Sequence, residues 1–266
     1  MNENRKLKKL LAERHEYVRC EIEGGRLENV ISLMDSLSAA FKLPRTEYDR
    51  SECTPYSNEV SDRYCLDEYV NASFVPTAGT LFIAAQNPLD EKKHVFIDLL
   101  MKSNTRLVVS LINDAKYFDE EWLQERKTIE LEGKEVFVDE VYVIKNTSIR
   151  RLRYINWVDF SVLPPNEMDF FHRYFDAIRT ETVLVHCIAG VGRTGTFIMY
   201  DILKKTEALT LDIFISTFIC LRSLRAHLVT NKVQLEFLRN VFLANNRNHD
   251  AKKANPKPQQ TSFNSP

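Results

Sequence analysis

The sequence VLVHCIAGVGRTGTFIMY, from Val183 to Tyr200, decides the fold of this chain. It opens with the apolar run VLV, which predicts a buried strand. It ends in a second apolar run, TFIMY, which predicts the start of a helix. Two glycines, Gly190 and Gly192, and the small Ala189 lie between these runs. They let the backbone turn tightly, so that its N–H groups point inward where the helix begins.

This turn carries two side chains suited to phosphate chemistry, Cys187 and Arg193. A helix N-terminus has a positive dipole end and free N–H groups, so it attracts an anion. The planar guanidinium of Arg193 can bind two oxygens of a phosphate at once. A free cysteine is mostly thiol at neutral pH, and the groups that bind a phosphate also stabilise the thiolate. The pattern therefore indicates a phosphate-binding loop with an activated cysteine nucleophile.

The stretch resembles the signature loop of the protein tyrosine phosphatases, His-Cys-x-x-Gly-x-Gly-Arg-Ser/Thr-Gly, and meets every fixed position. The resemblance implies that Cys187 attacks phosphorus, that Arg193 binds the phosphate, and that the Thr194 hydroxyl helps the thiolate leave. We expect His186 to hold the loop through its ring N–H groups rather than to transfer protons. The loop itself is expected to bind substrate through Ile188, Ala189, Gly190, Val191 and Gly192. The alternative is a glycine-rich turn with a structural cysteine, which would need neither the arginine nor both glycines.

The composition is that of an ordinary globular protein. Of 266 residues, 44% are hydrophobic and 27% are charged, enough for one large domain or two small ones. The net charge of −1 gives no electrostatic reason to expect binding of nucleic acid.

No apolar run reaches the length of a membrane span, and the N-terminal residues lack the apolar segment of a signal peptide. Five scattered cysteines favour reduced thiols over a disulfide frame or a metal site. We expect a cytoplasmic monomer, with a nuclear location also open, that uses no cofactor and no metal.

Two further segments resemble parts of the tyrosine-specific branch of the family. Residues 67–75, DEYVNASFV, are similar to its Asp-Tyr-Ile-Asn-Ala-Ser segment, and residues 82–89, FIAAQNPL, to its Tyr-Ile-Ala-Thr-Gln-Gly-Pro-Leu segment. Plain β-structure with a turn would explain either alone, but their order ahead of the signature loop is informative. The resemblance also implies that Asn71 and Arg225 pair to brace the pocket wall, with an exposed arginine as the alternative.

Phosphate-ester hydrolysis through cysteine needs an acid that protonates the leaving oxygen and then acts as a base toward water. The candidate is Asp159 in residues 156–162, NWVDFSV, which resemble the family's Trp-Pro-Asp loop with Val158 in place of proline. We expect Trp157 to anchor this loop and Phe160 to contact the substrate. A helix cap or a surface carboxylate is the alternative for Asp159. Its distance along the chain from the cysteine matches the family and favours the acid.

Residues 229–234, VTNKVQ, resemble the family's glutamine loop, Gln-Thr-x-x-Gln. Gln234 matches the second glutamine and is expected to contribute to the substrate site. Thr230 replaces the first glutamine, which in the family positions the hydrolytic water. We therefore expect the cysteinyl-phosphate to be hydrolysed slowly relative to its formation, unless Gln234 takes over that role.

The sequence leaves the phosphotyrosine-recognition loop open. The family has Asn-Arg-Tyr-x-Asp, whose tyrosine stacks on the substrate ring. An ungapped count back from Pro55 places Arg50 at the tyrosine, whereas a short insertion places Tyr48 there. Either side chain can stack on a phenyl group. The link NDAKYF, residues 113–118, is shorter than the acidic loop that the family usually has, and Lys116 could still reach the site from it.

The remaining pattern predicts the framework around these motifs. Helices are expected on both sides of Gly24-Gly25 and over residues 94–102, 166–179, 192–206, 210–223 and 231–245; strands are expected over 106–112, 127–131, 135–144 and 149–155. The resemblance covers roughly residues 40–243 and implies one α/β domain, a highly twisted mixed β-sheet flanked by helices. We divide the chain into a helical segment, 1–43, that packs on a catalytic domain, 44–246, and a polar, Pro-containing tail, 247–266, expected to be disordered.

The resemblance as a whole implies a non-receptor, tyrosine-specific phosphatase that hydrolyses phosphotyrosine in proteins. A binding module that holds phosphotyrosine without turnover is one alternative, suggested by Val158, Thr230 and the altered recognition loop. A dual-specificity, lipid or RNA-end phosphatase is another. Phosphoinositide-specific relatives tend to carry lysines within the signature loop, and the variable positions here, Ile188, Ala189 and Val191, are neutral.

Overall fold

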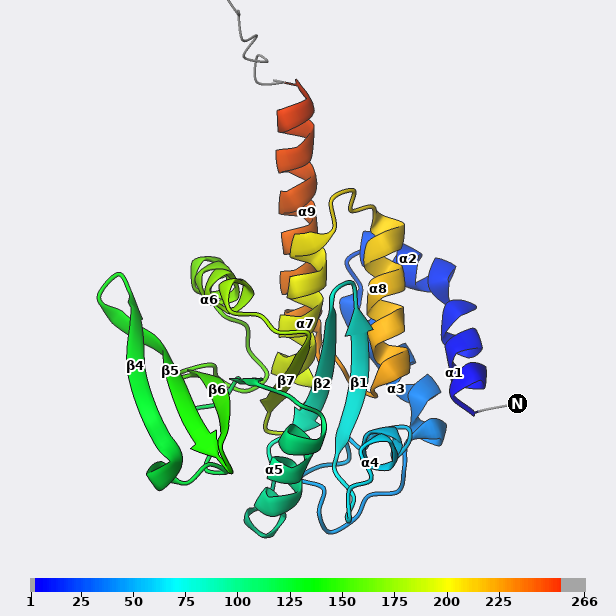
Figure 1. Cartoon of the computed structure of the whole chain (residues 1–266). Coiled ribbons are helices and arrows are strands. Elements are labelled where there is room, and N and C mark those ends of the chain that lie inside the picture. Colours follow the sequence, from blue (N-terminus) through cyan, green and yellow to red (C-terminus); the bar gives the residue numbers. More distant parts are fainter. Residues whose placement is uncertain (1–2, 255–266) are drawn as a thin grey trace, which may run out of the picture.

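Seven strands form one mixed sheet, in the order β1–β2–β7–β3–β6–β5–β4 (Figure 1). The computed structural model describes residues 3–254. Strands β2 and β3 both run parallel to β7, and β6 runs parallel to β3, while antiparallel pairs complete each side of the sheet. The predicted twisted, mixed sheet is confirmed. The strands are β1 (Ala72–Thr77), β2 (Thr80–Gln86), β3 (Leu107–Ser110), β4 (Leu123–Leu131), β5 (Lys134–Ile144), β6 (Thr147–Tyr154) and β7 (Thr182–Cys187).

Strand β7 lies inside the sheet, with β2 on one side and β3 on the other. Its residues Val183, Leu184 and Val185 are completely buried. A parallel strand covered by helices on both faces is apolar along its whole length, which is why this run does not alternate. The strand ends at Cys187, so the sheet itself delivers the signature cysteine to the carboxyl ends of its parallel strands.

Helices cover the sheet and extend to one side of it (Figure 1). Helix α7 packs on β7, and α8 and α9 pack on α7, while the three N-terminal helices pack on α8. The helices are α1 (Glu3–Ala12), α2 (His15–Glu23), α3 (Leu27–Ser38), α4 (Glu59–Arg63), α5 (Lys93–Lys102), α6 (Pro165–Ala177), α7 (Gly192–Lys205), α8 (Leu211–Leu224) and α9 (Lys232–Ala254). Three short 3-10 turns cover Ala39–Phe41, Asp90–Lys92 and Glu120–Trp122. No helix within residues 3–254 combines the length and apolar character needed to cross a bilayer.

The N-terminal segment differs from the prediction, because it forms three helices rather than two. The extra break falls at Glu13 and Arg14, two residues that favour helices, so the sequence carries no signal for it. Packing decides it: α1 and α2 both lie against α8, and both contribute side chains to the main core. This segment therefore shares one core with the sheet.

The C-terminal helix also differs from the prediction. Helix α9 runs to Ala254, so the predicted start of a disordered tail at residue 247 lies inside a helix. The prediction gave too much weight to the polarity of this stretch, which contains no proline before Pro256. The rest of the predicted tail, residues 255–266, lies outside the described residues.

Candidate active site

The signature loop joins β7 to α7 at the carboxyl end of the parallel strands. Its cysteine, Cys187, is 3% exposed, and its arginine, Arg193, lies in the first turn of α7 and is also 3% exposed. The N–H of Asn87, just after β2, donates to the carbonyls of both Cys187 and Ile188. The loop is therefore tied to the neighbouring strand on the side where it turns.

Two glycines of the motif are required by close backbone contacts. Gly190 has φ +71°, and a Cβ there would lie 2.1 Å from the carbonyl oxygen of Ala85. Gly195 is helical, but a Cβ there would lie 2.4 Å from the backbone nitrogen of Val229. Any larger residue would push the loop away from β2 or from the segment before α9. The prediction is thus confirmed for Gly190, whereas the second close backbone contact is at Gly195 rather than at Gly192.

A fully buried arginine holds the loop from behind. The Nε of Arg225 donates to the Gly190 carbonyl at 2.9 Å, and its Nη2 donates to the Ala189 carbonyl at 3.0 Å. The same Nη2 donates to Asn71 Oδ1 at 2.6 Å. The predicted pairing of Arg225 with Asn71 is confirmed, and the exposed alternative is wrong. Because these bonds occupy two loop carbonyls, they favour N–H groups facing the site.

Donors without partners gather at the centre of the site. The Nη1 of Arg193 donates to the Trp157 carbonyl at 2.7 Å. Its Nη2 lies 3.2 Å from Asp159 Oδ1 but makes no hydrogen bond there. Within the described residues, the buried Nε and Nη2 of Arg193 and the hydroxyl of Thr194 have no hydrogen-bond partner. Buried polar groups are normally paired, so this cluster fits an oxyanion that completes it.

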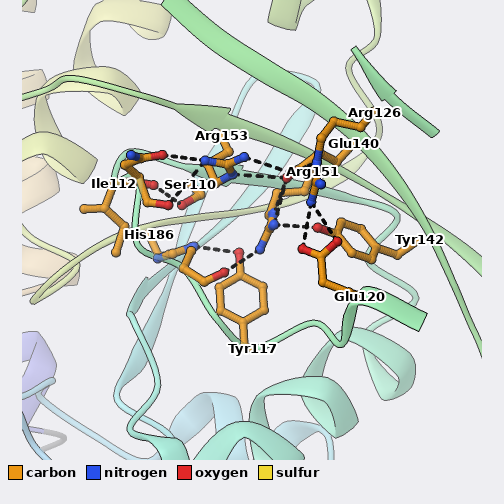
Figure 2. Close-up of polar contacts among 12 residues, drawn as sticks. Ser110, Ile112, Tyr117, Glu120, Arg126, Glu140, Tyr142, Arg151, Arg153 and His186 are labelled. Carbon is orange, nitrogen blue, oxygen red and sulfur yellow. Dashed lines mark hydrogen bonds and ion pairs between the residues drawn. The ribbon is translucent and has the colours of Figure 1, made fainter. Parts of the chain in front are cut away.

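His186 is held as a neutral ring (Figure 2). The Tyr117 hydroxyl lies 2.8 Å from Nε2, and Nδ1 lies 3.2 Å from the Cys187 carbonyl. A carbonyl only accepts, so Nδ1 carries the proton and Nε2 accepts from tyrosine. Burial lowers the pKa of His186 to about 3. The ring therefore fits the positioning role expected for it, and Tyr117, which the sequence did not single out, is its partner.

A buried carboxylate supports the short link at residues 113–118 from the neighbouring strands (Figure 2). Glu140 on β5 is completely buried and accepts from Arg151 at 2.8 Å and from Arg153 at 3.0 Å. Burial opposes its charge, but the hydrogen bond from Arg153 and the charge of Arg151 hold the pKa of Glu140 below its usual value. Arg151 then donates to the Ala115 carbonyl at 2.7 Å, and Arg153 donates to Asn113. The link lacks the acidic loop of the family but is anchored by arginines.

The two candidates for the recognition loop, Arg50 and Tyr48, lie in different surroundings. Arg50 lines a cavity of about 610 Å³ together with Trp157, Ile188 and Arg193. Its guanidinium donates to the carbonyls of Asn87 at 2.7 Å and Pro88 at 2.6 Å. The ring of Tyr48 instead lies under the ammonium of Lys92, 3.6 Å from its centre, and Tyr48 does not line this cavity. Lys116 does line it. The geometry favours the ungapped placement.

The loop of the candidate acid rests on a buried tryptophan. Trp157 is 4% exposed and packs edge-on against Tyr154, as expected of an anchor. The neighbouring Val158 and Phe160 are 71% and 65% exposed, so the tip of the loop has little packing of its own. Asp159 lies between them, close to the guanidinium of Arg193. The structure thus brings the candidate acid close to the arginine of the signature loop.

The two residues of the glutamine loop lie beside the signature loop. A Cβ on Gly192 would lie 3.1 Å from Thr230 Oγ1 and 3.0 Å from Gln234 Nε2. Gln234 is almost completely buried, and its Oε1 accepts from the Thr230 N–H at 2.9 Å. It does not line the cavity.

Among the described residues there is no group of three or more His, Cys, Asp or Glu side chains that could hold a metal ion.

Comparisons with known proteins agree with this geometry. The family model of protein-tyrosine phosphatases matches residues 46–244. Mouse tyrosine-protein phosphatase non-receptor type 20 is 24% identical over 206 residues, covering 66% of this chain and 48% of that protein. Mouse receptor-type tyrosine-protein phosphatase alpha is 28% identical over 209 residues, covering 66% of this chain and 25% of that protein. A solved structure of PTPN18 in complex with HER2 phosphopeptides matches with a TM-score of 0.66 at 20% identity, covering 91% of this chain and 98% of that chain.

The chain spans about half the length of the first of these relatives and less of the second. The structural match shows a common fold, and the family model extends over the sheet, the signature loop and most of the helices behind it. Both the sequence motifs and the arrangement of the site lie within the matched residues. The chain belongs to the protein-tyrosine phosphatase family.

Proposed function

We propose that this chain hydrolyses phosphotyrosine in proteins through a cysteinyl-phosphate intermediate. One observation carries the proposal: the unpaired donors of Arg193 and Thr194 gather in the loop that also holds Cys187. A phosphate would satisfy these donors and would lie in reach of the cysteine. The cytoplasmic location, action as a monomer and phosphotyrosine proteins as partners belong to the same proposal. The solved PTPN18 complex with phosphopeptides, on the same fold, supports this class of substrate.

In the first step, the Cys187 thiolate attacks phosphorus and the bond from phosphorus to the tyrosine oxygen breaks. Asp159 donates a proton to that oxygen, so tyrosine leaves as a neutral phenol. Arg193 stabilises the charge on the phosphoryl oxygens as the group transfers. Asp159 Oδ1 lies 3.2 Å from Arg193 Nη2, so a phosphate that binds the guanidinium replaces this contact and leaves the carboxyl free for the leaving oxygen.

In the second step, a water molecule attacks phosphorus and the sulfur–phosphorus bond breaks. Asp159, now a carboxylate, takes the proton from that water. The Thr194 hydroxyl, which has no other partner in the described residues, donates to the departing thiolate. Inorganic phosphate leaves and the starting state returns. We propose Thr230 and Gln234, which lie beside Gly192, as the side chains that influence this water.

The substrate ring would lie between Arg50 and the acid loop. Arg50 lines the cavity, and its guanidinium is held by two backbone carbonyls, so its plane is fixed before substrate binds. A fixed guanidinium plane can stack on an aromatic ring. We propose Ile188, which lines the cavity, and Phe160, an exposed residue of the acid loop, as further contacts to the substrate.

The test is a panel of initial rates with a phosphotyrosine peptide, a phosphothreonine peptide and a phosphoinositide. We expect turnover of the phosphotyrosine peptide alone, loss of turnover in Cys187→Ser, and retained peptide binding in that variant. The matched control is Cys220→Ser, an exposed cysteine on α8, which should keep the parental rate. Peptide binding without turnover in the parent would instead identify a binding module, and faster turnover of another substrate would contradict tyrosine specificity.

A further inference from the structure

A single side chain just before α9 contacts both the acid loop and the helix. The Nδ2 of Asn231 donates to the Phe160 carbonyl at 2.9 Å. Its Oδ1 accepts from the backbone N–H of Gln234 at 3.0 Å. We propose that Asn231 is a positioning residue that holds the acid loop, residues 156–161, closed over the site, so that Asp159 meets the leaving group. The proposal rests on the proposed function, because it assigns Asn231 a part in the same reaction.

The two bonds of Asn231 depend on each other. Accepting from the N–H three residues ahead is the usual bond of a helix N-cap, and this bond fixes the plane of the amide. The nitrogen of the same plane then points at the Phe160 carbonyl. A carbonyl needs a donor and a backbone N–H needs an acceptor, so only one orientation of the amide satisfies both partners. The N-cap bond therefore fixes the direction of the Asn231 Nδ2 donor independently of the acid loop.

The acid loop depends on few contacts of this kind. Within the part of the chain that the structure describes, two side chains from outside the loop hydrogen-bond its backbone, Arg193 at the Trp157 carbonyl and Asn231 at the Phe160 carbonyl. Val158 and Phe160 are largely exposed, and Phe160 has φ +58°, a conformation that a bulky side chain rarely adopts. Position 158 has valine rather than a proline that would stiffen the loop. The loop therefore depends on hydrogen bonds from outside on both sides of Asp159.

Arg193 and Asn231 differ in what happens when substrate binds. Arg193 must turn its free donors to the phosphate, whereas Asn231 has no part in binding phosphate and keeps its bond to Phe160. Asn231 also follows Thr230 directly, so the same short segment carries the loop contact and the residue that replaces the water-positioning glutamine. The geometry thus couples the position of the acid to that of the glutamine loop through one amide.

The test compares Asn231→Asp with the parent. Aspartate is as good an N-cap as asparagine, so the fold should keep its thermal midpoint. It has no donor for the Phe160 carbonyl and places a negative oxygen beside it. Loss of one hydrogen bond predicts a roughly 3- to 10-fold fall in kcat for phenyl phosphate. The fall should be smaller for dinitrophenyl phosphate, whose leaving group needs no acid, and the alkaline limb of the pH profile should weaken, because a general acid works only while it is protonated. The matched control is Thr210→Asp, a change at the N-cap of α8 away from the site, which should alter neither rate.

A double mutant and a spectroscopic readout make the outcomes decisive. In an Asp159→Ala background, Asn231→Asp should have no further effect on the leaving-group dependence, because the acid it positions is absent. Equal losses for both phosphates in the single variant, or additive losses in the double variant, would overturn the proposal. With Trp122→Phe in place, the fluorescence of Trp157 reports the loop without any turnover. Greater quenching of Trp157 by acrylamide in Asn231→Asp supports the proposal, and unchanged quenching refutes it, even if the proposed activity fails.

Discussion

Acidification from pH 7 to pH 5 is expected to destabilise the fold through His186. Burial lowers the pKa of this ring to about 3, whereas a histidine in an unfolded chain has a pKa of about 6.5. Between these values the unfolded chain binds one proton that the folded protein does not. The free energy of unfolding therefore rises with pH across this window, and the contribution is complete above about pH 6.5.

The size of the effect follows from the same two values. Each pH unit inside the window changes the free energy of unfolding by about 1.4 kcal/mol per proton. Between about pH 6.5 and pH 5 the loss is roughly 2 kcal/mol, and over the whole window it is on the order of 5 kcal/mol. A loss of roughly 2 kcal/mol is a large part of the stability of a typical domain, so it is measurable.

The assay is urea unfolding at pH 7, 6 and 5 for the parent and His186→Asn. Asparagine does not titrate, and other titrating groups contribute to both proteins, so their effects cancel in the difference. The parent should lose roughly 2 kcal/mol more than the variant between pH 7 and pH 5. As a control, His94→Asn at an exposed histidine should follow the parent. Equal losses in parent and His186→Asn would mean that the buried ring takes up a proton while folded, which refutes the neutral, positioning ring.

Three further predictions concern the proposed chemistry. Asp159→Ala should lower kcat by roughly 10²–10⁴-fold, the usual range for general acid catalysis. In a phenol-release assay the loss should be largest for poor leaving groups. Equal losses for good and poor leaving groups would contradict the acid role of Asp159. Arg193→Lys should weaken both substrate binding and turnover, measured as KM and kcat, because an ammonium cannot grip two oxygens; an unchanged kcat would contradict its part in the transition state. Thr230→Gln should raise steady-state turnover and shrink the burst of phenol seen on rapid mixing, and a parent without a burst would contradict slow hydrolysis of the intermediate.

The signature loop was predictable from sequence because its requirements are local. The buried strand, the turn and the helix follow each other within residues 183–200, and the shape of the turn depends on Gly190, whose φ is positive. The strand β7 and the helix α7 accordingly begin and end within a residue or two of the expected positions. The pairing of Asn71 with Arg225 also followed from the family resemblance, and the structure confirms it.

The sequence by itself thus determined the fold class, the cysteine loop and the residues of the candidate site that lie next to it. Tertiary structure alone shows that Arg50 lines the cavity whereas Tyr48 lies against Lys92, which supports Arg50 for the recognition loop. It also decided that Tyr117 is the partner of His186, 69 positions away along the chain, and that Asn231 contacts Phe160, 71 positions away. Local propensity and periodicity describe neighbours along the chain. Contacts at such separation form only when the packing of whole helices and strands brings the side chains together.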